Sequence, residues 1–206
     1  TVDCLPGVAS YVGSDISAGV LACRMDETDK LTLFLDVGTN GETVLGSREW
    51  LVTCACSAGP AFEGAGVQFG MRATKGAIEE VWISGPDAAN PYEPSYRVIG
   101  GSKPRGICGS GLISLLAEMF LTGVVDKSGN INLALADTNP RIRSGDHGSE
   151  YVIAWGTNTE HGKDIAVTDV DIDNLKRAKA AIYAGFTVLA QSVGVPLELV
   201  DQVLIG

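Results

Sequence analysis

The sequence is poor in positive charge and in long apolar runs, and each lack removes a class of protein. Lys and Arg total 15 against 25 Asp and Glu, a formal net charge of −10. Nucleic-acid binding is therefore disfavoured, because it normally needs a basic surface. No window approaches the roughly 18 consecutive apolar residues of a transmembrane helix. The first residues also lack the basic stretch and apolar run of a secretory signal.

Cysteine is scarce and unpaired, which argues against a disulfide framework. The five cysteines are an odd number, and no C-x-x-C pair occurs. Reduced thiols in a cytoplasmic protein are expected, with no zinc or iron–sulfur site inside the chain. Cys54 and Cys56 are interpreted as small core-facing residues of a strand. Cys108 has neither histidine near it in sequence and is interpreted as a small buried thiol.

Glycine is the residue in excess, at 26 of 206, or about 13% against a usual ~7%. Hydrophobic residues make up 45% and charged residues 19%, a globular composition. Such a chain is expected to have many tight turns, or backbone that approaches a ligand closely. The chain has no initiator Met and stops at Val203–Gly206 inside an expected strand. We therefore expect one lobe, residues 1–206, from a longer protein.

Apolar periodicity and turn signals predict an α/β fold. Three sequential antiparallel strands open it, at 31–35, 43–46 and 50–55, and an irregular insertion follows over about 57–107. The other predicted strands are 77–84, 96–99, 150–155, 164–167 and 202–205, and the predicted helices are 14–23, 109–121 and 168–193. Strands alternating with helices favour a mixed sheet with flanking helices, in the ribonuclease-H-like order if a helix follows Gly206. Residues 126–149 are expected to form surface loops.

Two of the predicted helices carry start signals. Ser14 is a candidate N-cap of the first helix. Thr168–Asp171 resembles a capping box with Asp in place of Glu or Gln. Gly194 and Pro196 are expected to end the last helix.

The segment Asp36–Glu42, Asp-Val-Gly-Thr-Asn-Gly-Glu, is the sharpest candidate site. A carboxylate at the end of a buried strand is costly without a partner such as Mg²⁺ or a hydrogen-bond donor. A tight turn with glycines and a Thr hydroxyl can hold a phosphate through exposed backbone N–H groups. The alternative is an ordinary hairpin whose Asn40-Gly41 turn takes positive φ.

Two further segments are rich in glycine. Gly109-Ser110-Gly111 opens a predicted helix, whose N-terminal N–H groups and dipole can attract an anion. The alternative is a small-residue entry that lets the helix pack tightly. Glu63 stands on a glycine-flanked turn and is either a cleft carboxylate or a solvated turn residue.

Several motifs in order resemble one family. They are 35–42, 57–64, 70–73, 104–112 and 178–185, and the resemblance covers nearly the whole chain. It is to the reductive activators of corrinoid-dependent proteins. The C-terminal part of these proteins belongs to the sugar kinase, heat-shock protein and actin ATPase superfamily. In this superfamily two related ribonuclease-H-like halves bind ATP in the cleft that separates them.

The resemblance implies roles for particular residues. Asp36–Glu42 would be the second phosphate loop: Asp36 would help hold Mg²⁺ through water, and the Gly38–Gly41 backbone, including Thr39 and Asn40, would bind phosphate oxygens. Gly109–Gly111 would line the same cleft. Gly206 would begin the adenosine-contacting segment. Glu42 and Glu63 are candidates to orient the attacking water.

The resemblance also implies the activity of the parent protein. ATP hydrolysis would drive one-electron transfer from a two-iron two-sulfur cluster, outside this chain, to a cobalt(II) corrinoid on a partner protein. The other expected partners are the N-terminal lobe and a second copy in a homodimer, with no nucleic acid and no membrane. The chain alone would be inactive. Two alternatives stay open: a kinase or activator of another enzyme with the same fold, and a non-catalytic docking domain.

Overall fold

The computed structural model describes residues 3–206 and divides the chain into two compact units. The first unit holds the residues up to Gly59 together with Ala178–Gly206, and the second is Pro60–Arg177. The predicted insertion at about 57–107 therefore begins where the second unit begins but covers only its first part. The single lobe over 1–206 stays a prediction.

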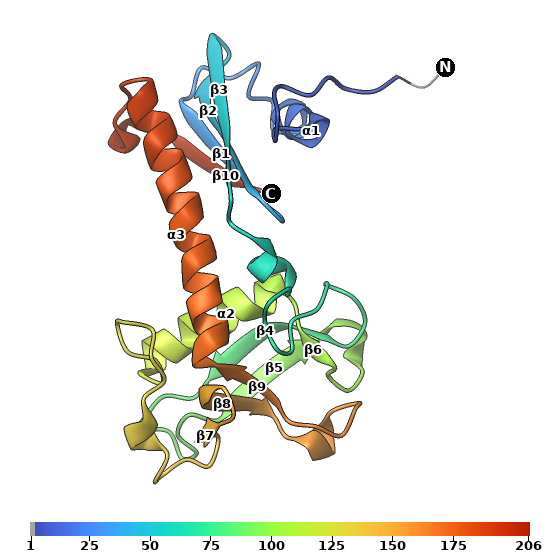
Figure 1. Ribbon diagram of the computed structural model, residues 1–206, viewed down its shortest axis with the longest axis vertical. Helices are drawn as coiled ribbons and strands as arrows, with labels where there is room; N and C mark the ends of the chain where they lie inside the picture. Colours follow the sequence, from blue (N-terminus) through green and yellow to red (C-terminus); the bar gives the residue numbers. More distant parts are fainter. Residues whose placement is uncertain (1–2) are drawn as a thin grey trace. The chain divides into compact units, whose positions relative to one another are not determined.

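The first unit is built on a four-stranded mixed sheet in the order β10-β1-β2-β3 (Figure 1). Its strands are β1 (Thr32–Val37), β2 (Gly41–Ser47), β3 (Trp50–Cys56) and β10 (Gln202–Ile205). The first three pair antiparallel in sequence order, as predicted, and β10 pairs parallel to β1. The predicted strand at 202–205 is confirmed, and it places the C-terminal residues beside β1.

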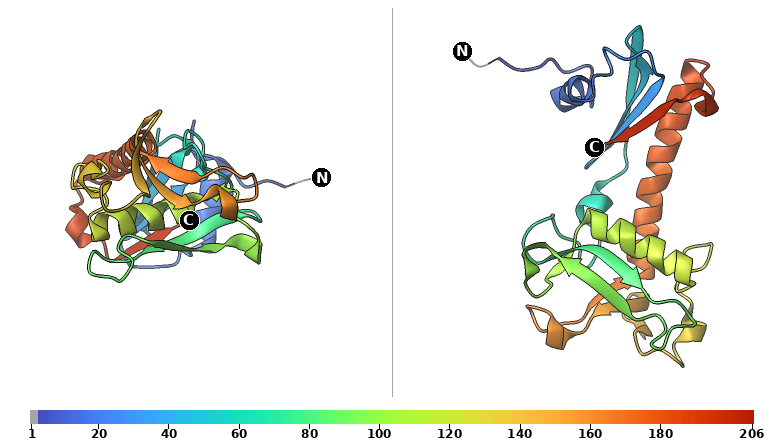
Figure 2. Two further views of the ribbon diagram at one scale, coloured as in Figure 1. Left: turned by 90° about the horizontal axis from the view of Figure 1, so that it is seen from below. Right: turned by 180° about the vertical axis from the view of Figure 1, so that it is seen from behind.

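Helices cover both faces of this sheet, because successive side chains of a strand point to opposite faces and β1 and β2 carry apolar side chains on both. Phe34 and Val44 pack with α1 (Ser14–Ala22) through Ile16. Leu33 and Leu45 pack on the opposite face with the end of α3 (Asp169–Ser192). Figures 1 and 2 show α1 and α3 on opposite sides of the strands. Residues of β1 at even positions therefore face α1, and residues at odd positions face α3.

The second unit contains two three-stranded sheets and α2 (Gly109–Thr122) (Figure 2). One sheet has the order β5-β4-β6, with β4 (Ala77–Ile83), β5 (Pro94–Val98) and β6 (Gly106–Ile107). The other has the order β7-β8-β9, with β7 (Ile142–Gly145), β8 (Gly148–Ala154) and β9 (Ile165–Thr168). The α/β class is confirmed, but the strands form three sheets rather than one.

Helix α2 occupies the edge of β4 that β6 leaves unpaired. Strand β6 pairs with β4 only at Ala77 and Ile78. Beyond that point, three α2 side chains bond the β4 backbone. Ser110 Oγ donates to the Glu79 carbonyl at 3.0 Å, Ser114 bonds both the N–H and the carbonyl of Val81, and Glu118 accepts from the Ile83 N–H at 2.9 Å. Since these side chains are four residues apart, one helix face satisfies the strand edge.

Of the two predicted helix start signals, the structure confirms one and contradicts the other. Thr168 and Asp171 form the predicted capping box: Thr168 N–H donates to Asp171 Oδ2 at 2.9 Å, and Asp171 N–H donates to Thr168 Oγ1 at 3.2 Å. Ser14 is not the N-cap of α1, which is Gly13, with no side-chain cap bond. Gly123 ends α2 in the left-handed conformation, which glycine adopts at little cost.

The prediction that 126–149 is all surface loop is wrong, because this range holds β7 and the start of β8. Strand β7 has little apolar periodicity. It is held to β8 by its ladder and by the ion pair of Arg143 with Glu150, at 2.6 Å. An edge strand stabilised by a cross-strand ion pair needs no hydrophobic alternation.

No helix within residues 3–206 is both long enough and apolar enough to span a membrane.

Candidate functional site

The candidate site is the turn between β1 and β2, which we call the Asp36–Glu42 hairpin. Asp36 and Glu42 are directly opposite in the β1–β2 ladder, and Val37 is opposite Gly41. Three residues, Gly38–Asn40, make the turn, which the Gly38 N–H closes by donating to the Asn40 carbonyl at 3.1 Å. The hairpin is where the sequence predicted it, but it is not a two-residue Asn-Gly turn: neither Asn40 nor Gly41 has a positive φ.

The two glycines of the hairpin differ in what surrounds them. A Cβ on Gly41 would lie 2.7 Å from both Cys56 Sγ and Ile182 Cγ1, so close packing requires glycine there. Cys56 Sγ also donates to the Gly41 carbonyl at 2.6 Å. A Cβ on Gly38 would meet nothing nearer than the Asn40 carbonyl at 3.9 Å, and its φ is not left-handed. Neither a close neighbour nor a left-handed φ requires glycine at position 38, and a glycine here leaves the backbone open to a ligand.

Asp36 and Glu42 place two carboxylates side by side at the base of the turn. By strand alternation Asp36 lies on the α1 face of the sheet, in line with Phe34. The pKa of Glu42 is raised, first by burial and then by the negative charges of Asp15 and Asp36, while an Asn40 hydrogen bond opposes the shift. Like charges directly opposite in a ladder destabilise it, so this end of the sheet favours a cation.

Gly206 lies beside the hairpin base. Its N–H donates to the Leu35 carbonyl at 2.8 Å, and its carbonyl accepts from the Val37 N–H at 3.3 Å. These bonds extend the parallel pairing of β10 and β1 past Ile205. The fold thus brings together Asp36–Glu42 and Gly206, which are far apart in the sequence.

Gly109, Ser110 and Gly111 belong to the second unit, at the start of α2. A Cβ on Gly109 would lie 2.0 Å from the Phe62 carbonyl, and one on Gly111 would lie 2.2 Å from the Ile78 carbonyl. Ser110 is one of the three side chains that bond β4. Their packing accounts for all three residue types, and their place in a nucleotide site stays a prediction.

The remaining candidates are simpler. Cys108 is buried, and its Sγ bonds the Ile78 carbonyl at 3.3 Å, as expected of a structural thiol. Glu63 is exposed at the end of a short 3-10 helix, Pro60–Glu63. Burial raises the pKa values of the Cys54 and Cys56 thiols, which disfavours their thiolates.

Within the described part of the chain, no group of three or more His, Cys, Asp or Glu side chains is placed to hold a metal ion. A metal at the hairpin would therefore be held by one or two carboxylates together with other ligands. That is the usual manner of Mg²⁺, which keeps several waters and takes phosphate oxygens in nucleotide sites. Asp36 and Glu42 fit such a partly hydrated Mg²⁺ bound with a nucleotide.

The charge pair in the hairpin predicts how pH affects stability. Because the pKa of Glu42 is raised in the folded state, its contribution to stability is complete below the ordinary value of 4.5 and is lost as pH rises through the raised value. Glu42→Gln should therefore stabilise the protein near neutral pH, by about 0.5 kcal/mol, with the gain fading towards acid pH. Thermal unfolding at several pH values measures this, with the exposed Glu49→Gln as control. A gain that is constant with pH would contradict the account.

Comparison with known proteins identifies the family to which this fold belongs. A solved structure entitled "Reductive activator for corrinoid,iron-sulfur protein" superposes with a TM-score of 0.90 at 52% identity, covering 98% of this chain and 31% of that one. With its mixed sheet, flanking helices and second unit, the chain is an ASKHA domain, of the sugar kinase, heat-shock protein and actin superfamily. The family model described as the C-terminal ASKHA domain of RACo matches residues 30–206, and the chain belongs to this family.

Two curated relatives also have names that refer to corrinoid proteins. "Corrinoid activation enzyme RamQ" of Eubacterium limosum is 35% identical over 212 residues, covering 100% of this chain and 34% of the relative. The "[Co(II) methylated amine-specific corrinoid protein] reductase" of Methanosarcina barkeri is 27% identical, covering 94% of this chain and 34% of the relative. The chain thus spans about a third of the length of the curated relatives it matches.

Proposed function

We propose that the chain is the nucleotide-holding part of a protein that uses ATP to reduce a cobalt(II) corrinoid on a partner protein. The three relatives are named as a reductive activator, a corrinoid activation enzyme and a cobalt(II) corrinoid protein reductase. The observation that carries the proposal to particular residues is Gly38, a glycine at the tip of an acidic hairpin that neither packing nor φ requires.

The hairpin residues have separate tasks in this proposal. Asp36 would hold Mg²⁺ through water, and the backbone from Gly38 to Gly41 would bind phosphate oxygens at the turn. Gly206, hydrogen-bonded to Leu35 and Val37, fixes the neighbouring backbone where the adenosine would follow. Glu42, beside Asp36, is the candidate to orient water. The protein's charge of −10 leaves Mg²⁺ and backbone N–H groups, rather than lysines, to offset the phosphate charge.

ATP supplies the free energy for an uphill one-electron step. The electron would come from an iron–sulfur cluster elsewhere in the parent protein and would reduce the cobalt(II) substrate to cobalt(I), with no bond formed to this chain. This chain's residues bind the nucleotide and exclude or orient water around it.

The test mixes the full-length protein, its cluster reduced, with a cobalt(II) corrinoid protein and follows the cobalt absorbance. We expect reduction to cobalt(I) only with ATP and Mg²⁺ present, and the rate to fall to background when EDTA removes the metal. Equal reduction without ATP would contradict the proposal. ATP-dependent phosphorylation of a small molecule, with no change in cobalt, would favour the kinase alternative.

A further inference from the structure

The thiol of Cys56 connects the Asp36–Glu42 hairpin to α3. Cys56 is the last residue of β3 and lies directly opposite Gly41, the first residue of β2 after the turn. Its Sγ donates to the Gly41 carbonyl at 2.6 Å. Its side chain also packs against α3, where a Cβ on Gly185 would lie 2.9 Å from Cys56 Cβ and 3.0 Å from Sγ. All of these residues belong to the first unit.

Both neighbours of this thiol are glycine, and the thiol is part of the reason in each case. A Cβ on Gly41 would lie 2.7 Å from Cys56 Sγ. Gly185 stands inside α3, where glycine weakens a helix relative to alanine. The close approach of α3 to β3 at Cys56 is what this glycine permits. The hairpin and the helix are therefore both shaped to the same side chain.

Cys54 is a natural comparison for Cys56. It lies two residues earlier on the same strand, and alternation places it on the same face. Its Sγ donates to the Gly185 carbonyl of α3 at 3.6 Å. The two thiols share a strand, a face and a helix neighbour. They differ in that Cys56 bonds the hairpin and Cys54 bonds the helix.

The thiol of Cys56 stays protonated, as a donor must. Burial raises its pKa, and the negative charge of Glu42 raises it too, while backbone hydrogen bonds at Cys56 and Gly41 oppose the shift. A protonated thiol can donate a weak hydrogen bond but is a poor nucleophile. These properties suit a side chain that holds a backbone group in place rather than one that reacts.

The two arms of the hairpin are held from opposite sides. Gly206 bonds the β1 arm through the Leu35 carbonyl and the Val37 N–H. Cys56 bonds the β2 arm through the Gly41 carbonyl. The turn Gly38–Asn40 lies between the two arms, so the position of its backbone depends on both anchors.

We infer that Cys56 is a positioning residue of the nucleotide site, which holds the β2 arm against α3 so that the Gly38–Gly41 backbone keeps the geometry that binds phosphate. The inference rests on the proposed function, since it assigns Cys56 a role in that same site. A backbone fixed before the ligand arrives binds more tightly, because less conformational freedom is lost. The coupling is reciprocal, so bound nucleotide should in turn hold Gly41 against the thiol.

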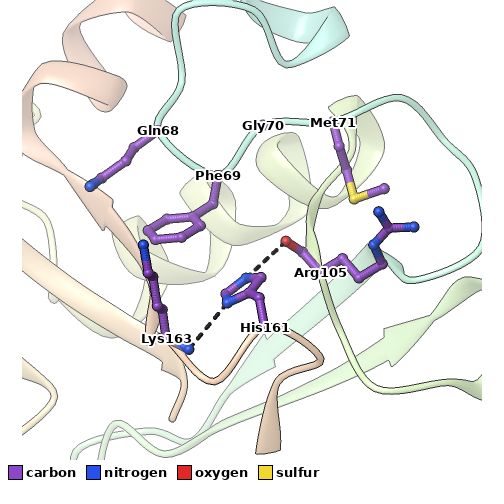
Figure 3. A pocket seen from close by; sticks show the side chains of 7 residues that line it. All are labelled: Gln68, Phe69, Gly70, Met71, Arg105, His161 and Lys163. Carbon is purple, nitrogen blue, oxygen red and sulfur yellow. Dashed lines mark hydrogen bonds between the residues drawn. The ribbon is translucent and has the colours of Figure 1, made fainter. Parts of the chain in front are cut away.

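The surface depression beside His161 belongs to the second unit and has no part in this contact (Figure 3). The His161 ring there bonds two backbone groups, the Arg105 carbonyl and the Lys163 N–H. His161→Gln therefore serves as a control for the loss of a bond between a side chain and the backbone outside the hairpin.

The first test is a calorimetric titration of the full-length protein with ATP and Mg²⁺. We expect Cys56→Ala to bind the nucleotide about fivefold more weakly than the wild type, the loss that corresponds to one hydrogen bond. Cys56→Ser should restore the affinity to within about twofold, because a hydroxyl can donate to the same carbonyl. Cys54→Ala and His161→Gln should stay within about twofold of the wild type, since neither removes a bond to the hairpin.

The second test needs no variant. Thiols of the full-length wild type are alkylated with N-ethylmaleimide in ATP with Mg²⁺ and in ATP with EDTA. Fragment mass spectrometry then quantifies Cys54 and Cys56 separately. We expect Mg²⁺ and ATP to slow the labelling of Cys56 at least about threefold, because the ligand stabilises the closed hairpin. Cys54 should respond less, and a thiol that only fills the core would not respond in this way.

The outcomes separate this inference from the proposed function. If the wild type does not bind ATP with Mg²⁺, the proposed function fails and the inference fails with it. If the wild type binds, the inference alone is overturned when a folded Cys56→Ala protein binds equally well or when Cys54→Ala loses as much affinity. Thermal unfolding shows whether each variant is folded. If Cys56→Ala does not fold, labelling decides, and a Cys56 rate unchanged by the nucleotide overturns the inference.

Discussion

Gly38→Ala is expected to leave the protein folded and to lower the rate of ATP-driven cobalt reduction at least about tenfold. The new Cβ would have no neighbour closer than 3.9 Å, and the φ of Gly38 is not in the left-handed range that disfavours other residues. The unfolding temperature should therefore change little. In the proposed site, the methyl group would cover backbone that a bound phosphate approaches closely.

Asp36→Asn is the companion variant. The amide keeps the size of the side chain but removes the negative charge that we propose holds Mg²⁺, so the loss should resemble that of Gly38→Ala. Steady-state rates of ATP hydrolysis and of cobalt reduction measure both variants. Full activity in a folded Asp36→Asn protein would remove the metal-holding role of Asp36 while leaving the role of Gly38 to be judged by its own variant.

Gly111→Ala is expected to destabilise the second unit by about 3 kcal/mol. A Cβ at this position would lie 2.2 Å from the Ile78 carbonyl and 2.9 Å from Ile107 Cγ2. Helix α2 would have to move away from β4, and the bonds from Ser110, Ser114 and Glu118 to the strand edge would lengthen together. Such loss leaves buried backbone groups unpaired, which adds to the cost of the clash.

Gly85→Ala is the matched control, because nothing lies within 4 Å of a Cβ there. Its effect should stay within about 0.5 kcal/mol. Scanning calorimetry of the full-length protein compares the two variants. If Gly111→Ala unfolds like the wild type but loses its response to ATP, the glycine serves a ligand and the packing explanation fails.

The features that the sequence predicted well are those specified by neighbouring residues. The hairpin at Asp36–Glu42 follows from a strong apolar strand and a polar turn, and the capping box at Thr168–Asp171 from side chains three residues apart. The resemblance of several ordered motifs predicted the family, which the match over residues 30–206 confirms.

The features it missed depend on contacts between distant segments. Gly41 is glycine because Cys56 and Ile182 fill the space beside it, and a local turn rule assigned it a positive φ instead. From the sequence alone, the polar Ser110–Glu118 face of the helix cannot be distinguished from an exposed helix surface. In the structure this face bonds the edge of β4 that β6 leaves unpaired. The stack of His161 on Phe69 joins two segments that no local pattern connects.

The most direct test of the account is a calorimetric titration of the full-length protein with ATP and Mg²⁺, comparing wild type with Gly38→Ala. The account predicts that the variant unfolds at the wild-type temperature and binds the nucleotide at least about tenfold more weakly, a loss of about 1.4 kcal/mol or more. Equal affinity in the two proteins would contradict the assignment of the Asp36–Glu42 hairpin as the phosphate-binding loop.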